Sequence, residues 1–598
     1  MSGNPNKLRR FWQELKRRRV IHVVTVYASA AFVVIELAGN LTGPLHLPPG
    51  LSTIVVIVLA VGFPLAVILS WIYDLTGEGW ERTRPLDEDG GDAAAREAKV
   101  PNAWKIATVA SFVVIAGLVT FNIMSTTRWL RSGGIESLAI LPFNNYTGDD
   151  QMDWVASGMH ASLIGDMGKM TGLRVLGETT SKAYKDAKMT ATEIADKNHV
   201  EAIVEPTLTC YGDMVCIQVK VITTRPEEKV LWVEEYMEDK SQILNLYNRI
   251  TRRIADELKI NLTQQEERLL AESISIDPEA YDAYLHGRVL LDQFNPPSFH
   301  AAIDSFQKAK ELEPEWAAPY AGIAEVGSYQ RQIGIASESD MITMYTNLNK
   351  ALELDPNSAE SHHTNAVIAV WTEFNWEKGE NEFLKAIELN PSFERSHSFY
   401  AHLLSILRRT DEALYEGKIA EELDPENPFT LGLYESVLRD AGKCQEALYY
   451  TEKALAIDPD HPFLRGRLLE TYLCLGNYEG AFKEWKRFNY AMWEKYGVAE
   501  RVEKIFSEDG WDAFMRELIH LNQGVMAEEI QSYLPAALFE KYMIIGEYQK
   551  AVDNLVIMYK DNSRSPDYPY FSTQHYYERL KGDPRYLDIL RDMNLPVS

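Results

Sequence analysis

Residues 275–493 repeat a pattern of apolar, small and polar positions with a period near 34 residues. Each unit closes in a short helix-stop such as ELDP or ELNP. An alanine stands five residues before the closing proline. Because small residues let helices approach closely and proline ends a helix, this pattern predicts stacked helix pairs. The prolines are Pro314, Pro356, Pro391, Pro425 and Pro459, and the alanines are Ala309, Ala351, Ala386, Ala420 and Ala454.

A helix pair of this kind cannot bury its apolar face alone, so neighbouring pairs are expected to stack into an α-solenoid. One predicted second helix carries Ala447, Leu448, Thr451, Ala454 and Leu455, the spacing of a helix packed on one side. The phased alanines and prolines resemble those of the tetratricopeptide repeat. Beyond Trp493 the period fails. One more helix pair is predicted over LFEKYMIIGEYQKAVDNLV, and the preceding WDAFMRELIHL is expected to cap the array. Residues 494–598 as a whole are thus interpreted as a degenerate repeat with a C-terminal cap.

Residues 136–262 alternate between strand and helix patterns. SLAILPF predicts a buried strand, followed by a helix around Trp154 to Met170, the strand LRVLG and a helix over ATEIADKNH. AIVEPTLTC and VCIQVKVITT predict a hairpin in which Leu208 pairs onto the face of Val215 and Ile217. A further strand through VLWVEEY and the helix ILNLYNRITRRIADEL complete a small α/β domain.

This order resembles the TolB N-terminal-like domain, also met in envelope proteins such as FlgO and CsgG. The resemblance rests on AILPF, on Gly158 in the first helix, on LRVLG followed by Thr180 and Ser181, and on the hairpin ending in QVKVI. Glu178 and Pro206 depart from the family, which often has a basic residue and a glycine there. The resemblance implies docking or assembly in a bacterial envelope, with no catalytic residues.

Three apolar stretches, at 20–41, 51–73 and 106–124, each approach the roughly 20 residues that a helix needs to cross a membrane. They predict a membrane domain over residues 20–125. Residues 1–19 carry seven Lys or Arg, the loop between the first two stretches has none, and the loop at 74–105 is basic near its ends. Lys and Arg close to the ends of membrane spans favour the cytoplasmic side. The N-terminus and the 74–105 loop are therefore expected in the cytoplasm, and residues 126–598 in the periplasm.

The whole layout resembles one group of bacterial membrane proteins. The shared features are a FWQELKRR-like opening, a GFP-containing second span ending near WIYDLT, the α/β domain, the repeats and a tail like DPRYLDILRDMNLP. Relatives of this group can carry an adenylate cyclase or DNA-binding domain at the N-terminus. The first nineteen residues are expected to leave no room for either.

The net charge of −27 disfavours nucleic-acid binding, because a phosphate backbone is held by clustered Lys and Arg. Of the four cysteines, Cys210 and Cys216 flank a tight turn that would put them on opposite faces, which disfavours a disulfide between them. Cys444 and Cys474 lie in predicted repeat helices and are interpreted as small buried hydrophobes. No spacing of Cys and His suggests zinc.

The sequence carries no signature of a phosphate-binding loop, a metalloprotease, a serine hydrolase or a dinucleotide-binding fold. Histidines gather at His362, His363, His397 and His402 on the first helices of adjacent repeats, and stacking could bring His363 near His397. Without cysteines or carboxylates at ligand spacing, surface or packing roles are the better interpretation. We therefore predict no catalytic, cofactor or metal site.

The first helix of each repeat is expected to line a long groove suited to an extended peptide or a helix. The fold class predicted is thus multidomain: three transmembrane helices, a small α/β domain and an α-solenoid. The function predicted is a non-enzymatic inner-membrane scaffold or adaptor, with a signalling subunit as the alternative; homo-oligomerisation stays open. Candidate groove residues are Trp371, Ser398, His402, Ser436, Arg439 and Asp440.

Overall fold

The computed structural model divides the chain into two compact units, Met1–Ser132 and Gly133–Ser598. In the first unit the strands β1 (Tyr73–Thr76) and β2 (Gly79–Arg82) pair antiparallel. The predicted spans at 20–41, 51–73 and 106–124 fall almost entirely outside the described residues. Within the described part of the chain, no helix is both long enough and apolar enough to cross a bilayer. The residues described are 27, 30, 31, 34, 59, 63, 73–76, 79–82, 135–148, 151–185, 187–211, 214–225, 227–239, 243–258, 276–292, 295–561 and 565–597.

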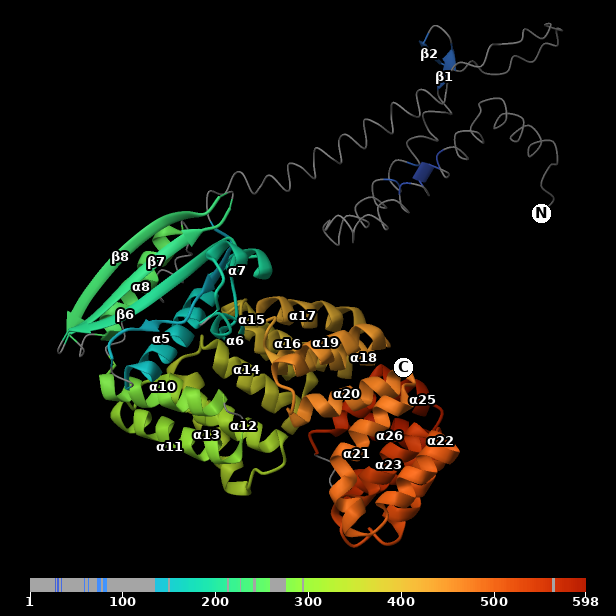
Figure 1. Ribbon diagram of the computed structural model, residues 1–598. Helices are drawn as coiled ribbons and strands as arrows, with labels where there is room; N and C mark the ends of the chain where they lie inside the picture. The colour runs from blue at the N-terminus through green and yellow to red at the C-terminus, as the bar shows by residue number, and fades with distance from the viewer. Residues whose placement is uncertain are drawn as a thin grey trace, which may run out of the picture. The chain divides into compact units, whose positions relative to one another are not determined.

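The second unit opens with a six-stranded mixed sheet in the order β5-β3-β6-β7-β8, with β4 paired to β6. Figure 1 labels its strands β6, β7 and β8. Strand β3 runs parallel to both β5 and β6, while β6, β7 and β8 form an antiparallel meander. Leu208 lies opposite Ile217, so the predicted hairpin register is confirmed. The strands are β3 (Ser137–Ile140), β4 (Asn144–Asn145), β5 (Arg174–Val175), β6 (Ala202–Tyr211), β7 (Met214–Thr223) and β8 (Lys229–Asp239).

Helices cover both faces of this sheet. Apolar residues of α5 (Gln151–Gly168) and α8 (Ile243–Glu257) pack on the face that holds Leu138, Val204 and Ile217. The other face, with Ala139, Ile203 and Ile222, is covered by α7 (Ala191–Asn198). These helices match the prediction. The short helix α6 (Glu178–Lys182) was not predicted, and the LRVLG strand is only two residues long.

Pro206 has a defined place in β6. The parallel partner of β6 is interrupted there, because β3 ends opposite Val204 and β4 begins opposite Thr207. A proline has no backbone N–H to offer, and it is tolerated in a strand where no acceptor waits for one. The unusual residue at this position thus fits a break in the ladder.

The helices from α10 to α21 form successive antiparallel pairs, which confirms the predicted solenoid (Figure 1). The phased alanines are all buried, from Ala309 and Ala351 to Ala454, as their role at close helix contacts requires. The pairs are α10 (Pro278–Asp292) with α11 (Pro296–Leu312), α12 (Ala317–Gln332) with α13 (Glu338–Leu354), α14 (Ala359–Ile368) and η3 (Ala369–Glu373) with α15 (Trp376–Leu389), α16 (Glu394–Ile406) with α17 (Thr410–Leu423), α18 (Pro428–Asp440) with α19 (Cys444–Ile457), and α20 (Pro462–Leu475) with α21 (Tyr478–Lys495).

After the array, the long helix α22 (Ala499–Gln523) contains WDAFMRELIHL and bends at Gly510, whose φ is 82°. Its Trp511 and Phe514 pack with Trp485 and Trp493 of α21 in one aromatic cluster. The predicted further pair is confirmed as α23 (Leu534–Ile544) and α24 (Tyr548–Asp561). The remaining elements are η4 (Gln531–Tyr533), η5 (Tyr568–Ser572), α25 (Gln574–Leu580) and α26 (Pro584–Asp592).

Cys444 and Cys474 correct the sequence interpretation. They form a disulfide with Cα atoms 5.9 Å apart, joining the start of α19 to the end of α20. Spacing in the sequence could not reveal this bond, because 30 residues separate the two cysteines and only the stacking of pairs brings them together. Cys216 is buried and carries a free thiol.

The α/β domain docks on the array through two turns that join successive pairs. In the turn after α17, the Gly177 N–H donates to Leu423 O at 2.7 Å, and Asp424 accepts from Thr180. In the turn after α15, Ser392 Oγ accepts from Val175 N at 3.1 Å. Gly158 has a steric role, because a Cβ there would lie 2.5 Å from Leu285 of α10. Two residues singled out by the family resemblance, Gly158 and Thr180, therefore hold the repeats.

Candidate functional site

The first helices of successive pairs, α14 with η3, α16, α18 and α20, each contact the next and form what we call the inner face of the array. All six candidate groove residues lie on these helices. All six side chains are also covered. Trp371 and Ser398 are 3% exposed, His402 is 6% and Ser436 is 5% exposed, and the side chains of Arg439 and Asp440 are 11% and 13% exposed.

The aromatic part of the inner face surrounds Tyr570 of η5. Its ring lies 6.4 Å from Trp371 and 5.7 Å from His402, between ring centroids. The His402 Nε2 atom is 3.1 Å from Leu433 O, and a carbonyl only accepts, so Nε2 carries the proton. Nδ1 must then accept from the Tyr570 hydroxyl at 3.2 Å. Burial lowers the pKa of His402 to about 4, which keeps this ring neutral at pH 7.

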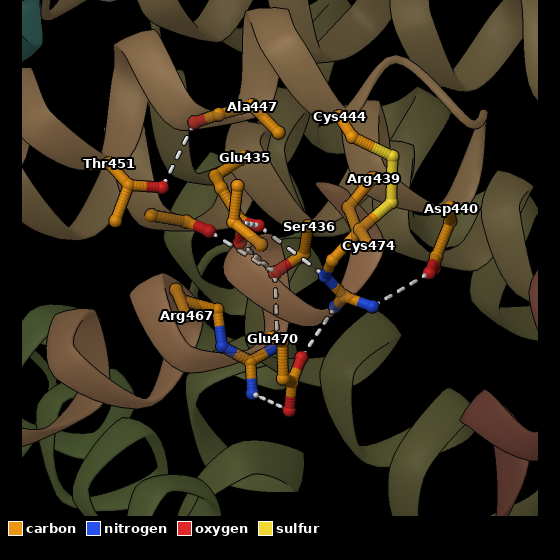
Figure 2. A network of polar contacts seen from close by, with 12 residues as sticks. Glu435, Ser436, Arg439, Asp440, Cys444, Ala447, Thr451, Arg467, Glu470 and Cys474 are labelled. Atoms are coloured by element: carbon orange, nitrogen blue, oxygen red, sulfur yellow. Dashed lines mark hydrogen bonds and ion pairs between the residues drawn. A yellow bond between two sulfur atoms is a disulfide. The ribbon is translucent and has the colours of Figure 1, made fainter. Parts of the chain in front are cut away.

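The ionic part of the inner face is a network on α18 and α20 whose side chains are buried at Glu435, 11% exposed at Arg439 and 38% exposed at Glu470 (Figure 2). Arg439 and Arg467 both reach Glu470, at 2.8 and 3.1 Å. Glu435 is fully buried and accepts from the Thr471 hydroxyl at 2.5 Å, with Arg439 Nε 3.4 Å away. The side chains are thus held by one another, and removing one would leave buried charge behind.

The pKa values of this network follow from burial and from its two arginines. Burial opposes ionisation of Glu470, but Arg467 and Arg439 outweigh it and lower its pKa. Burial dominates at Asp440 and raises its pKa to about 6, against the opposing effect of Arg439. Asp440 therefore stands near half-protonation in mildly acidic solution. The net charge of the network therefore changes with pH, and so does the charge that it presents to a segment packed against it.

The histidines first noticed in the sequence have separate partners. His362 contacts Glu382 at 2.6 Å, and His397 contacts Glu416 at 2.6 Å. His363 is buried and lies 3.1 Å from the Ser396 hydroxyl. Among the residues that the structure describes, no group of three or more His, Cys, Asp or Glu is arranged to hold a metal ion.

Sequence analysis missed Arg408, which begins the turn into α17 with a left-handed φ of 58°. Its guanidinium donates to Ser572 O at 3.3 Å and to Pro596 O at 2.7 Å, and lies 3.8 Å from the Tyr577 ring centroid. A signal for it was available. Residues 34 and 68 positions further on, Gly442 and Gly476, are the glycines of the equivalent turns.

No protein-family model matches the chain. Among curated proteins it is 27% identical over 239 residues to a putative adenylate cyclase 3 of Rhizobium meliloti, a match covering 39% of this chain and 40% of that protein. It is 24% identical over 298 residues to the transcriptional regulator HilA of Salmonella typhimurium, covering 48% and 51%. The chain therefore matches about half or less of the length of each of these curated relatives.

Solved structures with some likeness include TTC0263, a thermophilic TPR protein of Thermus thermophilus (18% identical, 32% of this chain and 99% of that one, TM-score 0.27). Another is PilW, a type IV pilus biogenesis factor (15% identical, 35% and 92%, TM-score 0.28). These TM-scores are low, so the class rests on the helix pairs of the chain itself. By those pairs it is an α-solenoid of stacked helix pairs, and the array carries a docked α/β domain.

Proposed function

We propose that this protein is a non-enzymatic scaffold or adaptor, anchored in a bacterial inner membrane by three helices, that holds protein partners in the periplasm through its repeat array. The observation that carries the proposal is the inner face. It runs along several pairs and combines aromatic rings with an ionic network, the mixture that suits recognition of a peptide or helix.

Two independent features support the periplasmic assignment. Basic residues gather before the first apolar stretch and in the loop at 74–105, which favours a cytoplasmic location for both. The disulfide between Cys444 and Cys474 fits an oxidising compartment, where such bonds persist. Cytosolic thiols are normally kept reduced.

The test of this topology uses Tyr449, whose side chain is 62% exposed on α19. A membrane-impermeant maleimide should label a Tyr449→Cys variant in spheroplasts without lysis. Labelling only after lysis would place the array in the cytoplasm. The unchanged chain is the control for reaction at its native cysteines.

The test of the scaffold uses in-cell crosslinking, purification of the full chain in mild detergent and mass spectrometry. Envelope proteins should copurify above the level of an untagged strain. Recovery of none would contradict the proposal. Membranes that contain the chain should make no cyclic AMP, although one relative is named as an adenylate cyclase.

A second candidate is a signalling subunit, in which partner binding changes the packing of the three spans. It is favoured by the names of the relatives, a cyclase and a transcriptional regulator, both of which describe outputs of signalling. Deleting residues 1–19 separates the two candidates. If the deletion abolishes the phenotype that depends on this protein while partner binding survives, the result supports signalling. An unchanged phenotype supports the scaffold.

A further inference from the structure

Residues 565–580, here called the tail segment, lie on the inner face. The segment comprises η5 and α25 and the residues that lead into them. Ser572 Oγ donates to Ile406 O at 2.6 Å, and Tyr570 meets His402 as described above. The ring of Tyr570 also packs against the ring of Trp371. The tail segment thus covers Trp371 and His402, two of the six residues that the sequence assigns to a partner.

The tail segment makes contacts of the kind a bound peptide makes. Its sequence, SPDYPYFSTQHYYERL, has no repeat phase and begins with a short 3-10 turn instead of a long helix. Several of its aromatic rings are half-buried, and of these Tyr570 and Tyr577 contact the array through His402 and Arg408. Aromatic side chains, and tyrosine with its polar hydroxyl in particular, are enriched at interfaces between proteins. The half-buried rings are Tyr570, Phe571, His575, Tyr576 and Tyr577.

The turns between the two helices of a pair give a second, independent observation. Four equivalent positions, 34 residues apart, all have left-handed backbone: Phe374 at 56°, Arg408 at 58°, Gly442 at 76° and Gly476 at 68°. Glycine adopts this conformation readily, whereas residues with a side chain do so at a cost.

The two turns that bear side chains are the two that hold the C-terminal region. Arg408 binds Ser572, Tyr577 and Pro596. Phe374 stacks on Trp376 with centroids 5.6 Å apart, and Trp376 Nε1 donates to Met593 O at 2.8 Å. Strained backbone is kept where contacts require it, so these two positions serve the docking of the C-terminal region, and Arg408 serves that of the tail segment in particular.

We propose that the tail segment is a resident, exchangeable occupant of the inner face, and that the protein partner presents the same chemistry. This partner segment carries a proline, then an aromatic pair, then a hydroxyl residue, as in Pro569–Ser572. Its tyrosine donates to His402 and its backbone carbonyl accepts from Arg408. The inference rests on the proposed scaffold function and names the class of ligand that the scaffold holds.

The experiment uses a fluorescent synthetic peptide of residues 565–580 and the full chain in detergent. In a Tyr570→Ala chain the resident segment is weakened, so the added peptide should bind at least tenfold more tightly than it binds the unchanged chain. Tyr449→Ala, which removes an exposed tyrosine elsewhere, should behave like the unchanged chain. A peptide carrying Tyr570→Ala should not bind. Equal binding by all three chains, or no binding by the Tyr570→Ala chain, would overturn the proposal.

A second measurement needs no variant. Excess peptide should speed hydrogen exchange in residues 565–580 of the unchanged chain and leave α18 and α19 unaffected. Unaltered exchange in the tail segment would make it a fixed part of the fold and overturn exchange of occupants. Because both measurements use a purified chain and a defined peptide, their failure is distinct from a failure to recover envelope partners.

Discussion

The carboxylate of Asp424 accepts two hydrogen bonds from Thr180, one from the backbone N–H at 2.7 Å and one from the hydroxyl at 2.6 Å. All these groups are buried. The contact joins α6 of the α/β domain to the turn that follows α17. The turn of a repeat, a place usually free in solvent, here serves as a connector between domains.

Replacing Asp424 by alanine should release α6 from the array. The N–H and hydroxyl of Thr180 would lose their buried acceptor, a loss of about 2 kcal/mol. Hydrogen exchange should show lower protection of α6 in Asp424→Ala. Asp458 holds the same place one repeat later and is exposed, so Asp458→Ala is the matched control. Equal effects of the two variants would contradict a specific role for Asp424.

Two glycines should respond oppositely to alanine. A Cβ at Gly177 would lie 2.4 Å from Asp424 Cγ, so Gly177→Ala should push the two domains apart and lower the melting temperature. Gly466 lies inside α20 with no neighbouring atom within 4 Å of a new Cβ. Gly466→Ala should raise stability by roughly 0.5–1 kcal/mol, the helix preference of alanine over glycine. Stabilisation by Gly177→Ala would argue against the close approach.

Loss of the Cys444–Cys474 disulfide should destabilise the array by about 3 kcal/mol, given a closed loop of this length. Denaturant unfolding followed by the fluorescence of its tryptophans measures the change in a Cys444→Ser/Cys474→Ser chain. Reducing agent should lower the free energy of unfolding of the unchanged chain and should not alter that of the double variant. The bond would be contradicted if Cys444 and Cys474 reacted as free thiols in chain purified from the envelope under oxidising conditions.

Glu394 should make stability fall as the pH rises. Its side chain is 15% exposed, and burial first, then the nearby Asp424, raises its pKa to about 7 in spite of Arg395. The folded chain therefore binds this proton more tightly than the unfolded chain, and stability is lost between about pH 4.5 and 7. Glu394→Gln should add up to about 3 kcal/mol at pH 8 and nothing at pH 4. Thermal unfolding at both pH values decides it, and an equal gain at both would contradict the raised pKa.

The repeat array could be predicted because its signal is local and periodic. Ala386 and Ala420 recur 34 residues apart, with a proline five residues after each, and packing needs nothing beyond that phase. The candidate groove residues stand on the first helices of their pairs. Their coverage could not be foreseen, because the tail segment that meets His402 lies 168 residues away and carries no repeat pattern.

The docking of the α/β domain escaped prediction for a related reason. The aspartates of ELDP and AIDP occur at 355, 424 and 458, and nothing in the sequence separates the one that binds Thr180 from the others. The fold makes the choice, since it is the turn at Asp424 that contacts α6. The three membrane spans stay a prediction, as they fall outside the described residues.

The most direct test of the central claim compares crosslinked partners of the full chain with those of a chain ending after Leu262. The shorter chain keeps the predicted spans and the sheet of the α/β domain but lacks every repeat. Protease resistance of the sheet domain controls for its folding. If the array is the binding surface, envelope proteins recovered with the full chain should be lost with the shorter one. Recovery of the same proteins with both would contradict the account and move binding to the α/β domain or the spans.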